Sequence, residues 1–265
     1  MKTMNHRSTG GFTLEELLIV VAIVGILAAT AVTLLQQRKP SGYSNRIHCV
    51  NNQKIIGTAF RVFASDNGDL YPLQATGKAY IVQGGAGEAQ VNSDSAAAWQ
   101  VAQAMWNEIQ SPKVLLCASD RERLKFFTVT DFSGLAGNSN GMISASLGYA
   151  PNRNNALSYG FGVAADESRP LGVLVVERNV SNVGPAGALI STNVALTNTR
   201  AVLNATAGPT QAVWVKGTPI HGLEGNLAYA DGSVQQVTAE VLRQSLENAA
   251  KSYSTVTNQN ELLFP

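Results

Sequence analysis

Few residues in this chain are suited to acid–base or metal chemistry. The sequence contains 3 histidines and 2 cysteines, and it has no Cys-x-x-Cys pair, which excludes zinc-finger and thioredoxin-type sites. His221 is followed along the chain by Asp231-Gly232. An imidazole and a carboxylate can bind a divalent cation, here with help from Glu177 or Asp166, or they can act as a general base pair.

The same two residues also have a purely structural interpretation. Asp231-Gly232 separates two short β-rich segments, 226–230 and 233–237, and Asp-Gly is favoured in the type I′ turn of a β-hairpin. His221 precedes a glycine-containing loop, where it can hydrogen-bond backbone or Asp231 itself. Three alternatives therefore stay open for this pair: a structural turn, a calcium or other cation site, and a catalytic pair.

Length and composition limit the kind of protein that positions these residues. A chain of 265 residues suits one domain or one and a half. Its formal charge is +1 and only 14% of its residues are charged, so it lacks the clustered Lys and Arg of a nucleic-acid surface. A hydrophobic content of 45% excludes a disordered chain.

The N-terminus contains one long apolar segment. Residues 17–35 carry no charge, and as a helix they would extend roughly 28 Å, close to the hydrocarbon thickness of a bilayer. This pattern predicts one membrane-spanning helix. A cleavable secretory signal ending at Ala29-Thr30-Ala31 is the alternative, but the apolar segment is long, and Glu15 and Glu16 stand at its entrance.

The residues around that entrance resemble a known family. The stretch 11–18, Gly-Phe-Thr-Leu-Glu-Glu-Leu-Leu, followed by the apolar segment, looks like the cleavage and methylation signature of type IV prepilins and type II secretion pseudopilins. The resemblance implies that a prepilin peptidase cuts after Gly11 and methylates Phe12. Loss of residues 1–11 removes Lys2 and Arg7, which changes the formal charge from +1 to −1.

The resemblance also implies how subunits assemble. Glu16 would neutralise the N-terminal ammonium of a neighbouring subunit, because an unpaired carboxylate in hydrocarbon costs about 2.5 to 3.5 kcal/mol. A charge at the end of the helix that reaches the headgroups is the alternative reading of Glu16. Glu15 departs from the family pattern, which usually has an aliphatic residue at that position.

Topology follows from the resemblance, because basic residues on both sides of the apolar segment do not settle it. It implies a single-pass protein of the cell inner membrane, with the leader cytoplasmic and the C-terminal part periplasmic or extracellular. The implied partners are prepilin peptidase, other pilin or pseudopilin subunits in a homo- or hetero-filament, and membrane lipid; nucleic acid is not expected.

The rest of the chain predicts an α+β, pilin-like fold: a long N-terminal transmembrane and stalk helix packed on an antiparallel β-sheet domain. An amphipathic pattern with Ile56, Phe60 and Phe63 on one stripe predicts a helix, with Gly68 as its left-handed cap. Thr238 is expected to cap a final helix. The expected divisions are a leader at 1–11, a transmembrane helix at 12–39, a stalk helix at 40–68 and a globular domain at 69–265.

Patches of this outer part resemble one group of prepilin-like proteins. The group has a C-terminal His-x9-Asp-Gly element, matched by His221, Asp231 and Gly232. The stretch 49–57 and Leu-Cys-Ala-Ser-Asp at 116–120 are also similar to elements of this group, with alanine replacing a proline in the second. Calcium at the His221 and Asp231 element has support only by analogy with major pseudopilins; otherwise no cofactor is expected.

With that topology, Cys49 and Cys117 lie outside the reducing cytoplasm. A disulfide between them would join positions 68 residues apart and contribute about 4 kcal/mol of stability. Two free, buried thiols are the alternative.

These observations predict a non-enzymatic structural subunit of a pilus or a type II secretion pseudopilus. One alternative is a membrane-anchored surface protein that does not polymerise and binds polysaccharide or another ligand. In that case the exposed faces of Trp99, Trp106 and Trp214 would stack on sugars. A tethered hydrolase using His221 and Asp231 is the second alternative.

Overall fold

A computed structural model describes residues 13–36, 42–75, 77–84, 88–91, 95–134, 145–183, 199–203, 205, 211–215, 220–252 and 260–265. The predicted cleavage site, Gly11 and Phe12, lies outside these residues. The chain divides into two compact units, Met1–Ser41 and Gly42–Pro265, and each is described by itself.

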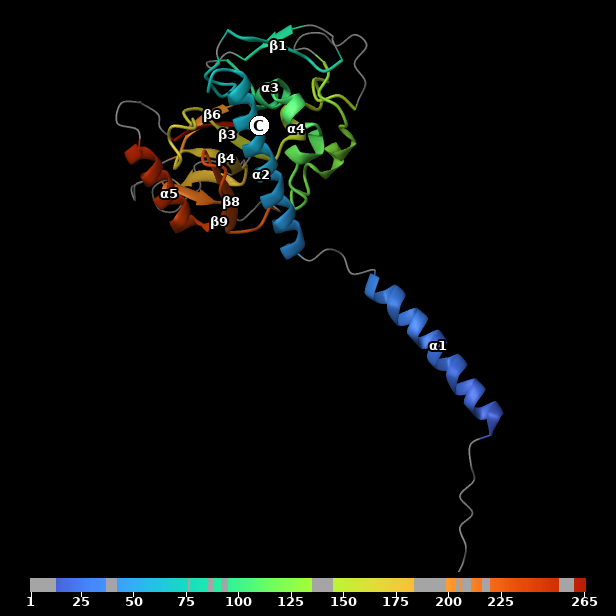
Figure 1. Cartoon of the computed structure of the whole chain (residues 1–265). Coiled ribbons are helices and arrows are strands. Elements are labelled where there is room, and N and C mark those ends of the chain that lie inside the picture. Colours follow the sequence, from blue (N-terminus) through green and yellow to red (C-terminus); the bar gives the residue numbers. More distant parts are fainter. Residues whose placement is uncertain are drawn as a thin grey trace, which may run out of the picture. The chain divides into compact units, whose positions relative to one another are not determined.

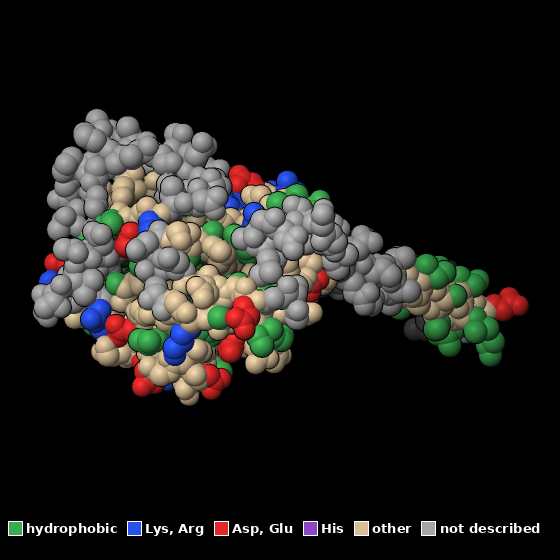
Figure 2. Space-filling model, turned by 90° about the horizontal axis from the view of Figure 1, so that it is seen from above, with side chains coloured by type: hydrophobic (Ala, Val, Ile, Leu, Met, Phe, Trp, Pro, Cys, Tyr) green, Lys and Arg blue, Asp and Glu red, His purple; other side chains and the backbone are tan. Residues whose placement is uncertain are grey.

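The first unit contains helix α1, Leu14–Gln36. Glu15 and Glu16 lie in its first turn, and its large apolar side chains from Leu14 to Leu27 are exposed. In Figure 2 these side chains form an apolar surface with acidic side chains at one end. Among the residues that the structure describes, no helix is both long enough and apolar enough to cross a membrane.

The second unit begins with helix α2, Gly42–Asp66. Its apolar stripe is buried as the sequence predicts, because Cys49, Ile56 and Phe60 recur at helical spacing, whereas Lys54 and Arg61 are exposed. The helix ends before Gly68, whose left-handed φ of +71° is the conformation that glycine adopts without strain.

A six-stranded antiparallel sheet forms the body of this unit (Figure 1), in the order β6-β10-β3-β4-β8-β9. Its strands are β3 Tyr159–Gly162, β4 Val173–Glu177, β6 Thr199–Val202, β8 Glu224–Tyr229, β9 Val234–Thr238 and β10 Glu261–Phe264. The predicted α+β class is confirmed, and a helix on an antiparallel sheet is consistent with a pilin-like fold. The helix that packs on this sheet is α2, and it belongs to the same compact unit as the sheet.

The two faces of the sheet are covered by different helices. Successive side chains of a strand point to opposite faces, so Leu263 joins the core with Phe60 of α2, whereas Leu262 joins a second core. That second core contains Leu242 and Leu246 of helix α5, Ala239–Ser252. The Oγ1 atom of Thr238 accepts a hydrogen bond from the first turn of α5 and caps it as predicted.

Smaller elements complete the unit. Strand β1, Ala79–Ile81, pairs with β2, Glu88–Gln90, and β5, Val180–Val183, pairs with β7, Gln211–Trp214. The short helices are α3 Ala98–Ala104, α4 Trp106–Ile109, and the 3-10 helices η1 Pro112–Leu115, η2 Leu124–Thr128 and η3 Arg153–Ala156.

The predicted hairpin is present as β8 and β9, but its turn type differs from the prediction. Gly232 has a φ of +85° and Asp231 is not left-handed, whereas a type I′ turn needs both. The Gly232 N–H donates to the Tyr229 carbonyl oxygen, and the Tyr229 N–H donates to the Ser233 carbonyl oxygen. These bonds enclose a three-residue loop, in which only the last residue has to be left-handed.

Candidate functional site

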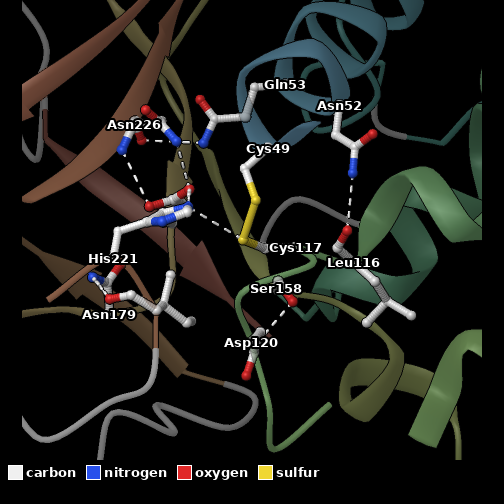
Figure 3. Close-up of a disulfide and its surroundings, with 12 residues drawn as sticks. Cys49, Asn52, Gln53, Leu116, Cys117, Asp120, Ser158, Asn179, His221 and Asn226 are labelled. Atoms are coloured by element: carbon white, nitrogen blue, oxygen red, sulfur yellow. Dashed lines mark hydrogen bonds and ion pairs between the residues drawn. A yellow bond between two sulfur atoms is a disulfide. The ribbon is translucent and has the colours of Figure 1, made fainter. Parts of the chain in front are cut away.

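A disulfide ties α2 to the segment that follows η1. It joins Cys49 to Cys117, whose Cα atoms are 5.2 Å apart, across 68 residues of sequence. Both cysteines are fully buried, and Figure 3 shows the bridge between the helix and the loop. The pair therefore belongs to the core at the junction of α2 with the sheet domain.

His221 packs directly against this bridge. Its Nε2 atom lies 3.4 Å from Cys117 Sγ and 3.3 Å from Glu177 Oε1. The His221 side chain is 2% exposed and that of Glu177 is 0% exposed. Burial of a carboxylate is costly unless it is paired and hydrogen-bonded, so Glu177 depends on its neighbours.

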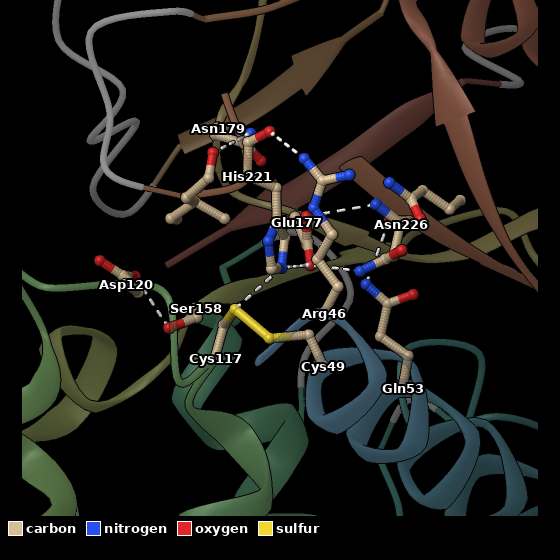
Figure 4. Close-up of polar contacts among 12 residues, drawn as sticks. Arg46, Cys49, Gln53, Cys117, Asp120, Ser158, Glu177, Asn179, His221 and Asn226 are labelled. Atoms are coloured by element: carbon tan, nitrogen blue, oxygen red, sulfur yellow. Dashed lines mark hydrogen bonds and ion pairs between the residues drawn. A yellow bond between two sulfur atoms is a disulfide. The ribbon is translucent and has the colours of Figure 1, made fainter. Parts of the chain in front are cut away.

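Asn226 satisfies much of that requirement. Its backbone N–H donates to Glu177 Oε2 at 3.2 Å, and its Nδ2 donates to Glu177 Oε1 at 2.8 Å. Gln53 Nε2 from α2 then donates to the Asn226 carbonyl oxygen at 3.1 Å (Figure 4). Residues of α2, β4 and β8 thus form one buried polar network beside the disulfide.

The loop that carries His221 is held from two sides. His221 has a φ of +40°, a left-handed conformation that costs a residue with a Cβ roughly 1 to 2 kcal/mol. Arg46 Nη2 donates to the His221 carbonyl oxygen at 3.0 Å, and Asn179 Nδ2 donates to the Ile220 carbonyl oxygen at 3.1 Å. These bonds keep the imidazole in the buried cluster.

A second buried network joins Arg178, the residue after β4, to Asp120 in the segment that follows Cys117. Arg178 Nε and Nη2 donate to the two carboxylate oxygens of Asp120, each at 2.7 Å, and Ser158 Oγ donates to Asp120 at 2.8 Å. The Arg178 and Asp120 side chains are 2% and 0% exposed. Glu122 accepts a further bond from Arg178, but its side chain is 60% exposed.

Sequence reasoning missed most of this arrangement. It named Glu177 as a possible ligand and Asp120 as part of a resembling element, but not Arg178 or Asn179. A signal was present: Glu-Arg-Asn at 177–179 directly follows the apolar residues of β4, and Glu177 is the last residue of that strand. Polar residues in that position must find buried partners, and each of the three reaches a different group.

The structure does not bring His221 and Asp231 together, as the cation-site and catalytic alternatives require. His221 precedes β8 and Asp231 follows it, and a six-residue strand is about 20 Å long. Asp231 accepts a hydrogen bond from the Ser233 N–H in the hairpin loop, and Asp166 pairs with Arg169. The sequence analysis named three candidate carboxylates, those of Glu177, Asp166 and Asp231. Of these three, Glu177 is the one that lies beside His221.

Asp231 instead lines a surface pocket of about 340 Å³ between the hairpin and α5. Seven of its nine lining residues carry a polar group, namely Tyr229, Asp231, Ser233, Gln235, Gln244, Ser245 and Asn248; the other two are Leu171 and Val241. The tryptophans proposed as sugar platforms lie elsewhere. Trp99 and Trp214 are buried core residues, and the partly buried Trp106 donates from Nε1 to the Ile81 carbonyl oxygen at 2.8 Å.

Burial around the disulfide also affects a tyrosine. Tyr159 of β3 is fully buried, and this burial, together with the nearby Glu177 carboxylate, raises its pKa well above the usual range. A group whose pKa is raised in the folded state stabilises the fold below the unfolded pKa of about 10, and this stability is lost as the pH rises further.

We therefore expect the free energy of unfolding of Tyr159→Phe to depend less on pH in the alkaline range than that of the wild type. The free energy of unfolding, measured by urea titration between pH 9 and pH 12, should fall less steeply than in the wild type, by up to about 1.4 kcal/mol per pH unit. Tyr149→Phe, at a partly exposed position, is the matched control. Identical pH profiles for wild type and Tyr159→Phe would contradict the expectation.

In the first unit, Thr13 and Glu16 together cap the start of α1, which begins at Leu14. The Thr13 N–H and Oγ1 both donate to Glu16 Oε2, at 2.9 and 3.0 Å, and the Glu16 N–H donates to Thr13 Oγ1 at 3.4 Å. This is the reciprocal capping box that Thr-x-x-Glu favours. The sequence analysis did not identify it, although the spacing was visible.

Comparison with known proteins adds one match. Residues 6–32 match the family model of the prokaryotic N-terminal methylation motif, and this range contains Gly11, Phe12 and Glu16. The match indicates a prepilin-type protein. The motif indicates a type IV pilin or pseudopilin processed by a prepilin peptidase, and it is typical of membrane-anchored or pilus-associated proteins. No curated protein and no solved structure matches the chain.

Proposed function

We propose that this prepilin-type protein is a structural subunit of a type IV pilus-like filament or a type II secretion pseudopilus. One observation carries the proposal: the methylation motif at 6–32 leads into α1, whose described apolar side chains are exposed in the single chain. An exposed apolar helix needs partners, and packing against the α1 helices of other subunits supplies them.

Topology is part of the proposal. The uncharged segment 17–35 anchors the subunit once in the inner membrane before assembly, with residues 1–11 in the cytoplasm and residues 42–265 outside. The proposed partners are the peptidase, membrane lipid and other subunits of the filament. A disulfide between Cys49 and Cys117 suits this location, because such bonds persist outside the cytoplasm.

Glu16 is the proposed assembly residue. Its bond to the Thr13 N–H leaves carboxylate lone pairs free to accept a neighbour's N-terminal ammonium. Attraction between these opposite charges offsets the cost of each in an apolar surrounding.

We further propose that the chain is not an enzyme and belongs to the His-x9-Asp-Gly group. His221 and Glu177 are closed off from solvent, so neither can reach a dissolved substrate. Cys49, Cys117 and His221, which come from separate resembling patches, meet in one cluster, as residues of a shared structural core would. Filament formation as proposed needs no cofactor.

The test is Glu16→Gln in the full-length protein expressed with its peptidase. Glutamine keeps an oxygen that can cap α1 but removes the charge, so processing should continue while assembly fails. Leaving the neighbour's ammonium unpaired costs about 2.5 to 3.5 kcal/mol, which weakens association roughly a hundredfold. Filaments are quantified in the sheared fraction, and mass spectrometry checks for N-methyl-Phe12.

Glu15→Gln is the matched control, because it removes the adjacent charge, and it should assemble like the wild type. Equal filament yields for all three proteins would overturn the role of Glu16. An unprocessed Met1 in the wild type would overturn the proposal as a whole.

A surface protein that does not polymerise is a second candidate, and the pocket at Asp231 favours it. Its amide, hydroxyl and carboxylate groups suit a polar, neutral ligand such as a saccharide. The filament assay and mass spectrometry described for Glu16→Gln also separate the two candidates. A surface protein that does not polymerise predicts a processed wild-type chain without filaments.

A further inference from the structure

Four potential metal ligands converge at the disulfide. Cys49, Cys117, Glu177 and His221 each offer one donor atom, and all four atoms lie within 4.8 Å of one another. They come from α2, the segment after η1, the end of β4 and the loop before β8. Figure 4 shows the His221 imidazole and the Glu177 carboxylate lying on the same side of the bridge.

We propose that this chain binds one zinc ion at these four residues when the disulfide is reduced. Two thiolates, an imidazole and a carboxylate are a complete tetrahedral ligand set for this metal. The disulfide and the metal are then alternative ways of closing the same junction between α2 and the sheet domain. The two states exclude each other, because a sulfur in a disulfide is not a thiolate ligand.

The atom and electron balance is simple. A dithiol or phosphine reductant supplies two electrons, and two protons from water convert the disulfide to two thiols. Zinc binding breaks the two S–H bonds, forms two S–Zn bonds and releases both protons. Reoxidation by a disulfide oxidant reverses the sequence and expels the ion.

The distances suit this exchange. Ligand bonds of 2.0 to 2.3 Å in a tetrahedron place donor atoms about 3.3 to 3.8 Å apart. His221 Nε2 already lies 3.4 Å from Cys117 Sγ and 3.3 Å from Glu177 Oε1. The two bonded sulfurs have to separate, and any donor pair near the 4.8 Å limit of the cluster has to approach by about 1 Å. The 5.2 Å between the cysteine Cα atoms allows the sulfurs to separate by side-chain rotation.

The surrounding residues are those that a metal site needs. Asn226 holds both oxygens of Glu177, which fixes the carboxylate toward the imidazole. Two thiolates, one carboxylate and a zinc ion carry a net charge of −1. The positively charged guanidinium of Arg46, which donates to the His221 carbonyl oxygen, partly offsets this charge. The ligands are buried, so water does not compete strongly for the ion.

The test uses the full-length protein, purified in detergent, with cobalt(II) as the spectroscopic probe. After reduction with a phosphine and its removal without oxygen, we expect one cobalt per chain, with thiolate charge-transfer and tetrahedral d–d bands that zinc abolishes. The oxidised protein should show none of these bands. His221→Gln should weaken binding at least tenfold, whereas Asp231→Asn, outside the cluster, should bind like the wild type.

Several results would overturn the proposal. These are a reduced protein without tetrahedral cobalt bands, equal binding by His221→Gln, or a reduced protein that has lost its native circular dichroism. Cys49→Ser gives an independent check, since it needs no reductant and keeps Cys117, Glu177 and His221. It should still bind zinc through the three remaining ligands, but at least tenfold more weakly than the reduced wild type; loss of all binding, or binding as tight as that of the reduced wild type, would contradict the proposed site.

Discussion

Replacing Asp120 with alanine is expected to lower the free energy of unfolding by about 3 to 5 kcal/mol, as is usual when one member of a buried ion pair is removed. The variant leaves the Arg178 guanidinium buried at 2% exposure without its bidentate partner, and it removes the acceptor of Ser158 Oγ. Urea unfolding followed by tryptophan fluorescence measures the change.

Glu122→Ala is the matched control, because this carboxylate also contacts Arg178 but is 60% exposed. Exposed pairs contribute about 0 to 1 kcal/mol, so this variant should remain close to the wild type. The double variant Asp120→Leu/Arg178→Met should be more stable than Asp120→Ala, since it leaves no unpaired charge. Equal losses for Asp120→Ala and Glu122→Ala would refute the view that burial makes this pair important.

Loss of the Cys49–Cys117 disulfide should have a comparable effect. In the chain-entropy account, cross-linking residues 68 apart contributes about 4 kcal/mol by restricting the unfolded chain. Cys49→Ala/Cys117→Ala should therefore show a lower urea midpoint. It should also show a steeper dependence of the unfolding free energy on urea, because the unfolded state expands when the link is absent.

The wild type treated with reductant in metal-free buffer should approach the stability of this double variant. Reductant should leave the double variant unchanged, which controls for effects of the reagent itself. A loss below about 1 kcal/mol would mean that packing of α2 on the sheet, rather than the covalent link, holds the junction together.

Features that depend on neighbours in the sequence could be predicted. The stripe of Ile56, Phe60 and Phe63 repeats with helical spacing, and α2 buries it. Gly68 and Thr238 mark helix ends, because the groups that they satisfy belong to the adjacent turn. The motif at 6–32 is likewise a local pattern, which is why comparison with a family model finds it.

Local prediction failed where the geometry of a loop depends on its register. Asp-Gly correctly indicated the β8–β9 hairpin, but the same dipeptide serves both a two-residue and a three-residue loop. The hydrogen-bond pairing of Tyr229 with Ser233 selects the longer loop, in which only Gly232 is left-handed. Pairing of whole strands decides that register, and the dipeptide does not contain it.

By itself, the sequence determined the prepilin-type N-terminus, the α+β class and the position of α2, because each rests on residues a few positions apart. The tertiary structure alone decided the partners of the buried polar groups. An extended strand carries Asp231 away from His221, while the antiparallel pairing of β4 with β8 brings Glu177 and Asn226 together across 49 residues. Polar groups removed from water must pair with whatever the fold places beside them, and sequence spacing does not measure that distance.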